Sequence, residues 1–284
     1  MTASDYLSSL SVFRGDAPLI VSLPHTGTEI PSEYEAGLVS LWLARKDADW
    51  WIEQLYDFAP GLGATVIRTP ISRTVIDVNR DPTGISLYPG QATTELCPTT
   101  TFDGEPLYEP GTAPTAEEIA ERRARFFDPY HATLRTEVER LRARHERVVV
   151  YDCHSIRSVI PRLFDGTLPH FNIGTNGGVT CAPALSVAVE TICADSGFSH
   201  VVNGRFKGGY ITRNLGKPET GVHAIQMELA CRGYMREPLG PVTEGAWPTP
   251  YDEAYAAPMR AVLTRIFEAC LSFAAPEASP RTKP

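Results

Sequence analysis

Residues 147–162 read RVVVYDCHSIRSVIPR and join the pattern of a buried strand to polar residues that can carry chemistry. Residues 148–151, VVVY, are all apolar and three of them are β-branched, which suits a central strand covered on both faces. Asp152, His154, Ser155 and Arg157 follow directly. In open α/β sheets, ligands bind beyond the carboxyl ends of such strands. The stretch therefore predicts a central strand with a functional site at its end.

Other segments place polar residues at the same expected edge. Residues 17–24, APLIVSLP, predict a second buried strand that ends at His25. Residues 221–229, GVHAIQMEL, predict a strand whose side chains alternate and which carries Glu228 near its carboxyl end. One histidine at a strand end is more often a structural residue that bonds to the backbone. A functional site is therefore expected only if these segments bring their polar residues together at one edge of the sheet.

The segments between these strands complete an α/β pattern with a mostly parallel sheet. Residues 64–68 predict another strand, and residues 72–80, SRTVIDVNR, alternate and end in Asn79-Arg80. Helices are expected over residues 47–58, 115–141, 182–197 and 251–273, the second of them capped by Thr115. Residues 172–178 are expected to form a glycine-rich turn, and residues 81–114 an excursion that covers a site.

Several residues in this pattern allow more than one interpretation. Asp47 or Asp49 can cap the helix that begins there, and one of them can instead be a ligand. His131 and His145 are expected at the surface, without a role. A hydrolase that uses Cys153 or Ser155 with His154 is disfavoured, because adjacent residues of a strand point to opposite faces.

Composition limits the kind of protein that this is. The chain has 284 residues and a net charge of -8, which argues against nucleic-acid and anionic-membrane partners. No apolar run reaches the roughly 20 residues of a membrane span. The six cysteines form no CxxC pair, and the N-terminus lacks the pattern of a secretion signal. We expect a cytoplasmic enzyme with reduced thiols and a small-molecule substrate; the oligomeric state stays open.

Two histidines and a carboxylate with a fourth position left open form a catalytic zinc site. Such an ion lowers the pKa of water and polarises a carbonyl. A further carboxylate can move the proton, and arginines can bind a carboxylate substrate by bidentate contacts. The residue types found at the expected sheet edge suit this chemistry.

The chain resembles the N-formylglutamate deformylase (N-formylglutamate amidohydrolase) family of histidine breakdown. The resemblance lies in blocks spread over residues 17–240, which read SLPHTGTEIP, DADWWIEQLYDF, SRTVIDVNR, DCHSIRSVIPRLFDGTLPHFNIGTNGG, FKGGYITR and GVHAIQMEL. It implies the fold of zinc carboxypeptidases and aspartoacylases: a single α/β domain, residues 1–275, with a mixed sheet flanked by helices. A flexible tail, residues 276–284, is expected to follow.

The resemblance also implies roles for individual residues. Zinc, or another divalent metal, would be held by His25, Asp49 and His154. Asp49 is preferred to Asp47 because it directly precedes Trp50; the usual His-x-x-Glu spacing is absent, and Asn214 stands where the family often has His. The catalytic residues would be Glu228, as the general base, and Arg73, which polarises the carbonyl. The substrate-binding residues would be Asn79, Arg80, Arg157 and Arg213.

The implied reaction is hydrolysis of N-formyl-L-glutamate, a linear amide, to formate and L-glutamate. A deacylase for another acidic N-acyl amino acid is one alternative. A non-catalytic binding protein that keeps the pocket is the other.

Overall fold

The computed structural model describes residues 6, 9–86, 90 and 92–276. Within these residues, seven strands form one mixed sheet in the order β1-β3-β2-β4-β7-β5-β6. Strands β3, β2, β4 and β7 run parallel, whereas β1 and β5 are antiparallel to their neighbours β3 and β7. The strands are β1 (Ser11–Phe13), β2 (Leu19–Leu23), β3 (Thr65–Arg68), β4 (Val148–Ile156), β5 (Phe171–Gly174), β6 (His200–Val202) and β7 (Val222–Ala230).

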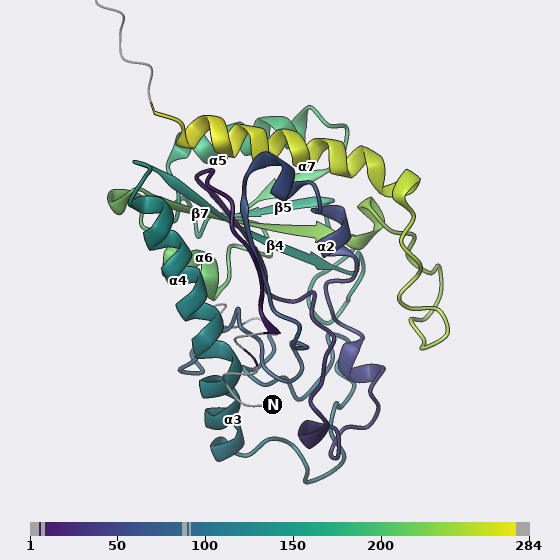
Figure 1. Cartoon of the computed structure of the whole chain (residues 1–284). Helices are drawn as coiled ribbons and strands as arrows, with labels where there is room; N and C mark the ends of the chain where they lie inside the picture. Colours follow the sequence, from purple (N-terminus) through teal and green to yellow (C-terminus); the bar gives the residue numbers. More distant parts are fainter. Residues whose placement is uncertain (1–5, 7–8, 87–89, 91, 277–284) are drawn as a thin grey trace, which may run out of the picture.

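Helices cover both faces of this sheet. Figure 1 shows α5 and α7 lying along one face and α4 and α6 on the other. The helices are α2 (Ile52–Leu55), α3 (Ala116–Arg122), α4 (Asp128–Arg142), α5 (Pro183–Ala194), α6 (Tyr210–Leu215) and α7 (Glu253–Ala274). A π-helical turn, Arg123–Phe127, joins α3 to α4. The mixed α/β sheet flanked by helices that the sequence predicts is confirmed.

The alternation of side chains along β4 separates the core from the site. Val149, Tyr151 and Cys153 point into the apolar layer that contains α5 and α7. Val148 and Val150 point into the opposite layer, which contains α4. Successive side chains of a strand point to opposite faces, so Asp152 and His154 lie on the α4 side. The functional residues of β4 are therefore on the face away from α7.

The predicted central strand is longer than its apolar run. Residues of β4 continue to Ile156, and all nine are buried. His154 consequently lies inside the strand, paired with Glu228 of β7, rather than in a loop beyond it. Parallel pairing with β2 continues to Asp152 and pairing with β7 continues to Ile156, which fixes the positions of the polar residues.

The helix predicted to begin at Thr115 does so with a capping box. The Thr115 side chain accepts a bond from the Glu118 backbone, and the Glu118 side chain accepts one from the Thr115 backbone. The helices predicted over residues 182–197 and 251–273 are found as α5 and α7. The strands predicted over residues 17–24 and 64–68 are β2 and β3.

Other predictions are wrong. The helix expected over residues 47–58 shrinks to α2, because Trp51 before it adopts a left-handed φ of 65°. Neither Asp47 nor Asp49 caps that helix. The alternating residues 72–80 form turns, and residues 172–174 of the expected glycine-rich turn belong to β5. The three-residue strands β1 and β6 were too short to leave a pattern.

His131 is buried rather than exposed, which corrects another expectation. Its Nε2 donates to the Val78 carbonyl at 2.8 Å, and its ring packs against Phe127 and Tyr210. Burial lowers the pKa of His131 to about 4. The side chain therefore anchors the turn that carries Asp77 and Asn79 while staying neutral.

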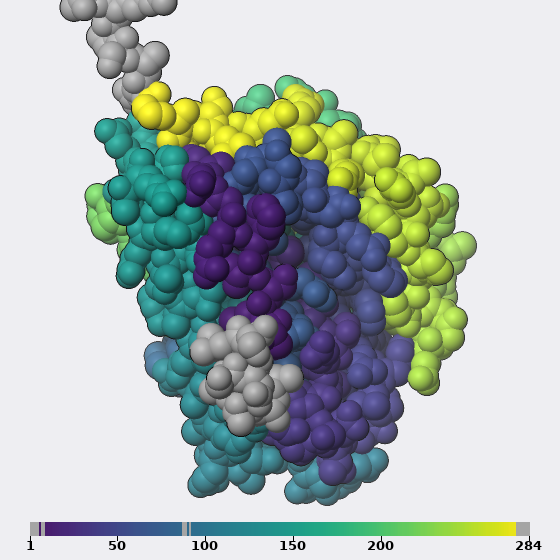
Figure 2. Space-filling view, in the orientation of Figure 1, coloured from purple at the N-terminus to yellow at the C-terminus, as the bar shows by residue number. Residues whose placement is uncertain are grey.

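The N-terminal segment packs onto the edge of the sheet. Figure 2 shows it, in purple, between the teal surface of α4 and the blue segment that precedes β3. Arg14 bonds to Glu137 of α4 at 2.6 Å, and the Ala17 backbone donates to the Gly63 carbonyl at 3.0 Å. The six cysteines are free and buried, as expected. Most of the predicted tail, residues 277–284, lies outside the described residues.

Among the described residues, no helix is long and apolar enough to cross a membrane.

Candidate metal centre

Three predicted ligands converge at one point. His25 follows β2, Asp49 lies just before α2, and His154 lies on β4. All three are buried, and their ligand atoms lie within 4.8 Å of one another. The Nδ1 atoms of the two histidines are 3.1 Å apart, and Asp49 Oδ2 is 3.3 Å from His154 Nδ1 and 3.8 Å from His25 Nδ1. Donor atoms around a tetrahedral ion at ~2.0 Å stand roughly 3.3 Å apart.

The far side of each histidine ring contacts its own carboxylate. His25 Nε2 donates to Asp77 Oδ1 at 2.7 Å. His154 Nε2 lies 3.0 Å from Asp152 Oδ2. These contacts place each Nδ1 on the side of Asp49. Burial lowers the pKa of His154, but Asp152 and Asp49 outweigh it and raise that pKa well above its usual value, so a metal ion at Nδ1 of His154 would replace a proton there. This carboxylate–histidine arrangement is the one that orients metal ligands in proteins.

The centre fits a cation. Two ring nitrogens and a carboxylate face one another, and neither oxygen of Asp49 has a hydrogen-bond partner among the described residues. Buried acceptors without a donor are costly, and a positive charge between them removes that cost. Burial and the neighbouring Arg73 lower the pKa of His25. The ring is thus neutral and available as a ligand.

Asp77 joins the centre to two arginines. Its Oδ2 accepts from Arg73 Nη2 at 2.7 Å and lies 3.5 Å from Arg80 Nε. Burial alone would raise the pKa of Asp77, but Arg80, His25 and Arg73 outweigh it and hold that pKa well below its usual value. Asp77 therefore stays ionised and positions both cations beside the histidines. No role for Asp77 is predicted from the sequence.

Asn79 is held from several directions. Its Nδ2 donates to Asp152 Oδ2 at 3.2 Å and lies 2.9 Å from His154 Nε2, while its Oδ1 accepts from the Ile211 backbone at 2.8 Å. A Cβ on Gly209 would come within 2.4 Å of the Asn79 amide. The backbone before α6 can approach this side chain only because residue 209 is glycine.

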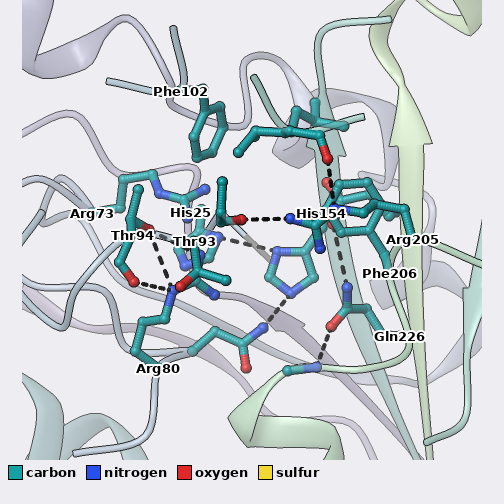
Figure 3. Close-up of a pocket in the computed structure, with 16 residues that line it drawn as sticks. His25, Arg73, Arg80, Thr93, Thr94, Phe102, His154, Arg205, Phe206 and Gln226 are labelled. Atoms are coloured by element: carbon teal, nitrogen blue, oxygen red, sulfur yellow. Dashed lines mark hydrogen bonds between the residues drawn. The ribbon is translucent and has the colours of Figure 1, made fainter. Parts of the chain in front are cut away.

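A pocket opens above the centre. Figure 3 shows His154 with Arg73 and Arg80 on one side, Arg205, Phe206 and Gln226 on the other, and Phe102 at a third. Its lining comprises His25, Arg73, Asn79, Arg80, Ala92, Thr93, Thr94, Phe102, His154, Ile156, Leu163, Arg205, Phe206, Gly209, Gln226 and Glu228. The predicted excursion over residues 81–114 supplies Thr93, Thr94 and Phe102.

Glu228 is the carboxylate of this pocket. It lies on β7, paired with His154, and Gln226 Nε2 donates to its Oε2 at 3.3 Å. Burial raises the pKa of Glu228 to about 7, against the opposing effect of His154. A carboxyl group tuned near neutral pH is suited to taking and returning a proton.

The structure brings most of the predicted site residues together, but not all. His25, Asp49 and His154 meet, and Arg73, Asn79, Arg80 and Glu228 line the pocket. Arg157 and Arg213 are not part of that lining. Arg157 Nη2 contacts Asp103 at 2.7 Å and Asp47 at 3.3 Å. Arg213 Nε donates to the Gly208 carbonyl at 2.8 Å.

Sequence reasoning missed residues of two kinds. Asp77 and Asp152 orient the histidines, and the position of Asp152, two residues before His154 on one strand face, was a usable signal. Phe102, Arg205 and Phe206 line the pocket from loops. No periodicity or spacing in the sequence points to the loop residues.

The fold and the pocket define an α/β protein with a candidate metal centre beside a set of arginines. Residues 17–235 match the family model described as N-formylglutamate amidohydrolase. The chain is 47% identical over 265 residues to the N-formylglutamate deformylase of Pseudomonas aeruginosa, covering 93% of this chain and 96% of that one. The enzyme of the same name from Pseudomonas putida is 46% identical over 267 residues, or 94% and 97% of the two chains.

A solved structure shares the fold. The crystal structure of N-formylglutamate amidohydrolase from Ralstonia eutropha superposes with a TM-score of 0.76 at 22% identity, over 94% of this chain and 98% of that one. The chain belongs to the N-formylglutamate amidohydrolase family.

Proposed function

We propose that this protein is a metal-dependent amidohydrolase that cleaves N-formyl-L-glutamate with water to formate and L-glutamate, a step of histidine degradation. The observation that carries the proposal is the meeting of His25, Asp49 and His154 at a point beside the pocket that His25, His154 and Glu228 line. The names of the Pseudomonas relatives support the substrate.

The ligand set of two histidines and one carboxylate suits zinc, with a position left for substrate or water. When bound there, zinc would supply a Lewis acid that polarises an amide carbonyl and makes water more acidic. His25 and His154 would hold it through Nδ1, oriented by Asp77 and Asp152.

The residues around the centre divide the remaining work. Glu228 takes a proton from the attacking water and returns it to the nitrogen of the leaving glutamate. The Arg73 guanidinium, fixed by Asp77, faces the carbonyl oxygen as negative charge develops on it. Burial of these groups strengthens both interactions.

Arg80 is the proposed partner of a substrate carboxylate. Its Nη2 and Nε bond to the Thr94 side chain and carbonyl at 3.0 and 3.1 Å, so the guanidinium is already held at the pocket wall. A fixed guanidinium binds a carboxylate at a smaller entropic cost than a mobile one. Arg157 and Arg213 lie off the pocket lining, and we do not assign them this role.

The proposal is tested with purified protein, by measuring bound metal and the formate released from N-formyl-L-glutamate. We expect stoichiometric zinc or another divalent ion, loss of turnover on chelation and recovery on adding the metal back. Metal without formate release would indicate the non-catalytic binding protein instead.

The matched substrate N-formyl-L-glutamine lacks the side-chain charge. Because the half-buried Arg80 guanidinium would lose its carboxylate, kcat/KM should fall at least ~10²-fold. Equal values for the two compounds would contradict recognition of both carboxylates.

A further inference from the structure

We propose that Phe102 is a specificity-determining residue that limits the acyl group of the substrate to formyl. The inference rests on the proposed function and adds to it the residue that rejects larger N-acyl groups. The pocket has two unlike sides. Arg73, Arg80 and Thr94 form a polar side, and Phe102, with Ile156, belongs to an apolar one.

The Phe102 ring lies against the group proposed to face the carbonyl. The Arg73 guanidinium carbon is 4.8 Å from the ring centroid, and the Phe102 residue is only 7% exposed. An acyl substituent is bonded to the same carbon as the carbonyl oxygen. With that oxygen at Arg73, the substituent is directed toward the neighbouring ring. A formyl hydrogen needs little room there, whereas a methyl group would meet the ring.

Other apolar side chains continue this wall. Ile156 lies two residues after His154 on the same face of β4, and Leu163 and Phe206 also line the pocket. Phe102 and Ile156 belong to one buried cluster, against which Leu163 and Phe206 pack. The ring is therefore packed within that cluster and cannot move without disturbing it.

A tight turn over residues 101–105 presents the ring. Thr101 accepts from the Gly104 backbone at 3.0 Å, and Gly104 has a φ of 91°. The Phe102 backbone donates to Asp47 Oδ2 at 2.6 Å. Asp47, the alternative acid ligand, thus holds the backbone of the residue that limits the pocket.

Two cations fix the turn to the segments that supply the metal ligands. Asp103 Oδ2 contacts Lys46 Nζ at 2.6 Å and Arg157 Nη2 at 2.7 Å. Lys46 lies three residues before Asp49, and Arg157 three residues after His154. Lys46 is only 3% exposed, so the ion pair is buried on the Lys46 side, while the Asp103 side chain is partly exposed. The distance between the ring and the metal centre is thereby set by the same segments, and Arg157 acts as a positioning residue.

The test compares kcat/KM for N-formyl-L-glutamate and N-acetyl-L-glutamate in the wild type, Phe102→Ala and Phe102→Leu. The wild type should strongly favour the formyl compound. Room for one methyl group is worth about 10- to 200-fold in discrimination. We expect Phe102→Ala to raise the acetyl-to-formyl ratio at least ~10-fold and Phe102→Leu to raise it less. Thermal melts confirm that each variant is folded. If Phe102→Ala does not fold, Phe102→Leu still tests the proposal, because leucine retains more of the side-chain volume.

Phe164→Ala is the matched control. Phe164 packs on the same apolar cluster but does not line the pocket. The acetyl-to-formyl ratio of kcat/KM in Phe164→Ala should equal that of the wild type. An unchanged ratio in both folded Phe102 variants, or an equal rise in the control, would overturn the proposal. Failure of the proposed function is seen separately, as a wild type that releases no formate.

Arg157→Ala tests the support of the turn. A loosened turn raises the acetyl-to-formyl ratio in the same direction as Phe102→Ala. If Arg157 instead binds a substrate carboxylate, KM rises for both substrates while the ratio stays constant, and its positioning role is refuted.

Discussion

Asp152 and His154 lie two residues apart on one face of β4, and Asp152 Oδ2 is 3.0 Å from His154 Nε2. The strand itself thus supplies both a ligand and the group that orients it. Ser22 of β2 donates to the other carboxylate oxygen at 3.0 Å, and Tyr130 of α4 lies 3.0 Å from Ser22 Oγ. The orientation of the His154 ring is therefore connected to the packing of α4 on the sheet.

Asp152→Asn should weaken metal binding 10- to 100-fold, the usual effect of losing a partner that orients a histidine ligand. The substitution preserves shape but removes the charge that favours a proton on Nε2. Competition with a chelating dye gives the affinity. Asp128→Asn, an exposed change on α4, is the control and should bind metal like the wild type. Equal affinities for both variants would refute the orienting role.

Asp49→Asn should lose metal, whereas Asp47→Asn should retain it. The Asp49 oxygens face the two histidines without hydrogen-bond donors among the described residues, but the Asp47 carboxylate accepts from Phe102 and contacts Arg157. Metal analysis after dialysis distinguishes the two. The reverse result, with metal lost only in the Asp47 variant, would reassign the acid ligand.

Glu228→Gln should keep metal and lose turnover by ~10²–10⁴-fold, the typical contribution of a general acid–base group. The amide has nearly the same shape but cannot accept the proton from water. Formate release and metal content are measured on the same sample, with Glu190→Gln on the exposed side of α5 as the control. A Glu228 variant within a few-fold of the wild type would contradict the proton-transfer role.

His131 should make the fold less stable at pH 5 than at pH 7. Burial lowers its pKa to about 4, while the unfolded chain has the ordinary value of 6.5. As the pH falls below 6.5 the unfolded state takes up a proton that the folded state refuses, so stability is lost. The contribution of His131 to the free energy of unfolding is therefore about 2 kcal/mol smaller at pH 5 than at pH 7.

Urea unfolding at both pH values measures this effect. His131→Gln keeps a donor for the Val78 carbonyl but cannot titrate, so its free energy of unfolding should fall by about 2 kcal/mol less than that of the wild type over this range. The same pH dependence in both proteins would show that His131 is not responsible.

The sequence predicts the centre of the sheet because buried parallel strands are continuous apolar runs. Residues 148–151 and 19–21 show this pattern, and the strands they predict bring His154 and His25 to one edge. Glu228 arrives by the same rule on β7. Local chemistry thus determines the elements, and parallel pairing makes the site residues neighbours.

What sequence reasoning missed depends on contacts between distant residues. The helix expected from residue 47 is interrupted by the left-handed Trp51, whose indole donates to the Thr249 carbonyl at 2.8 Å. Phe102 reaches the pocket through ion pairs of Asp103 with Lys46 and Arg157. These contacts join residues that are far apart in the sequence, so they produce no periodic pattern in the residues next to Trp51 or Phe102.

The adjacency of β2, β4 and β7 has a consequence for how the protein folds. More than a hundred residues separate His25 from His154, and more than seventy separate His154 from Glu228. The three residues meet only when three parallel strands have paired. Such non-local pairings form late and slowly. We therefore expect metal capture to report completed assembly of the sheet rather than to nucleate it, so that added metal slows unfolding without accelerating refolding.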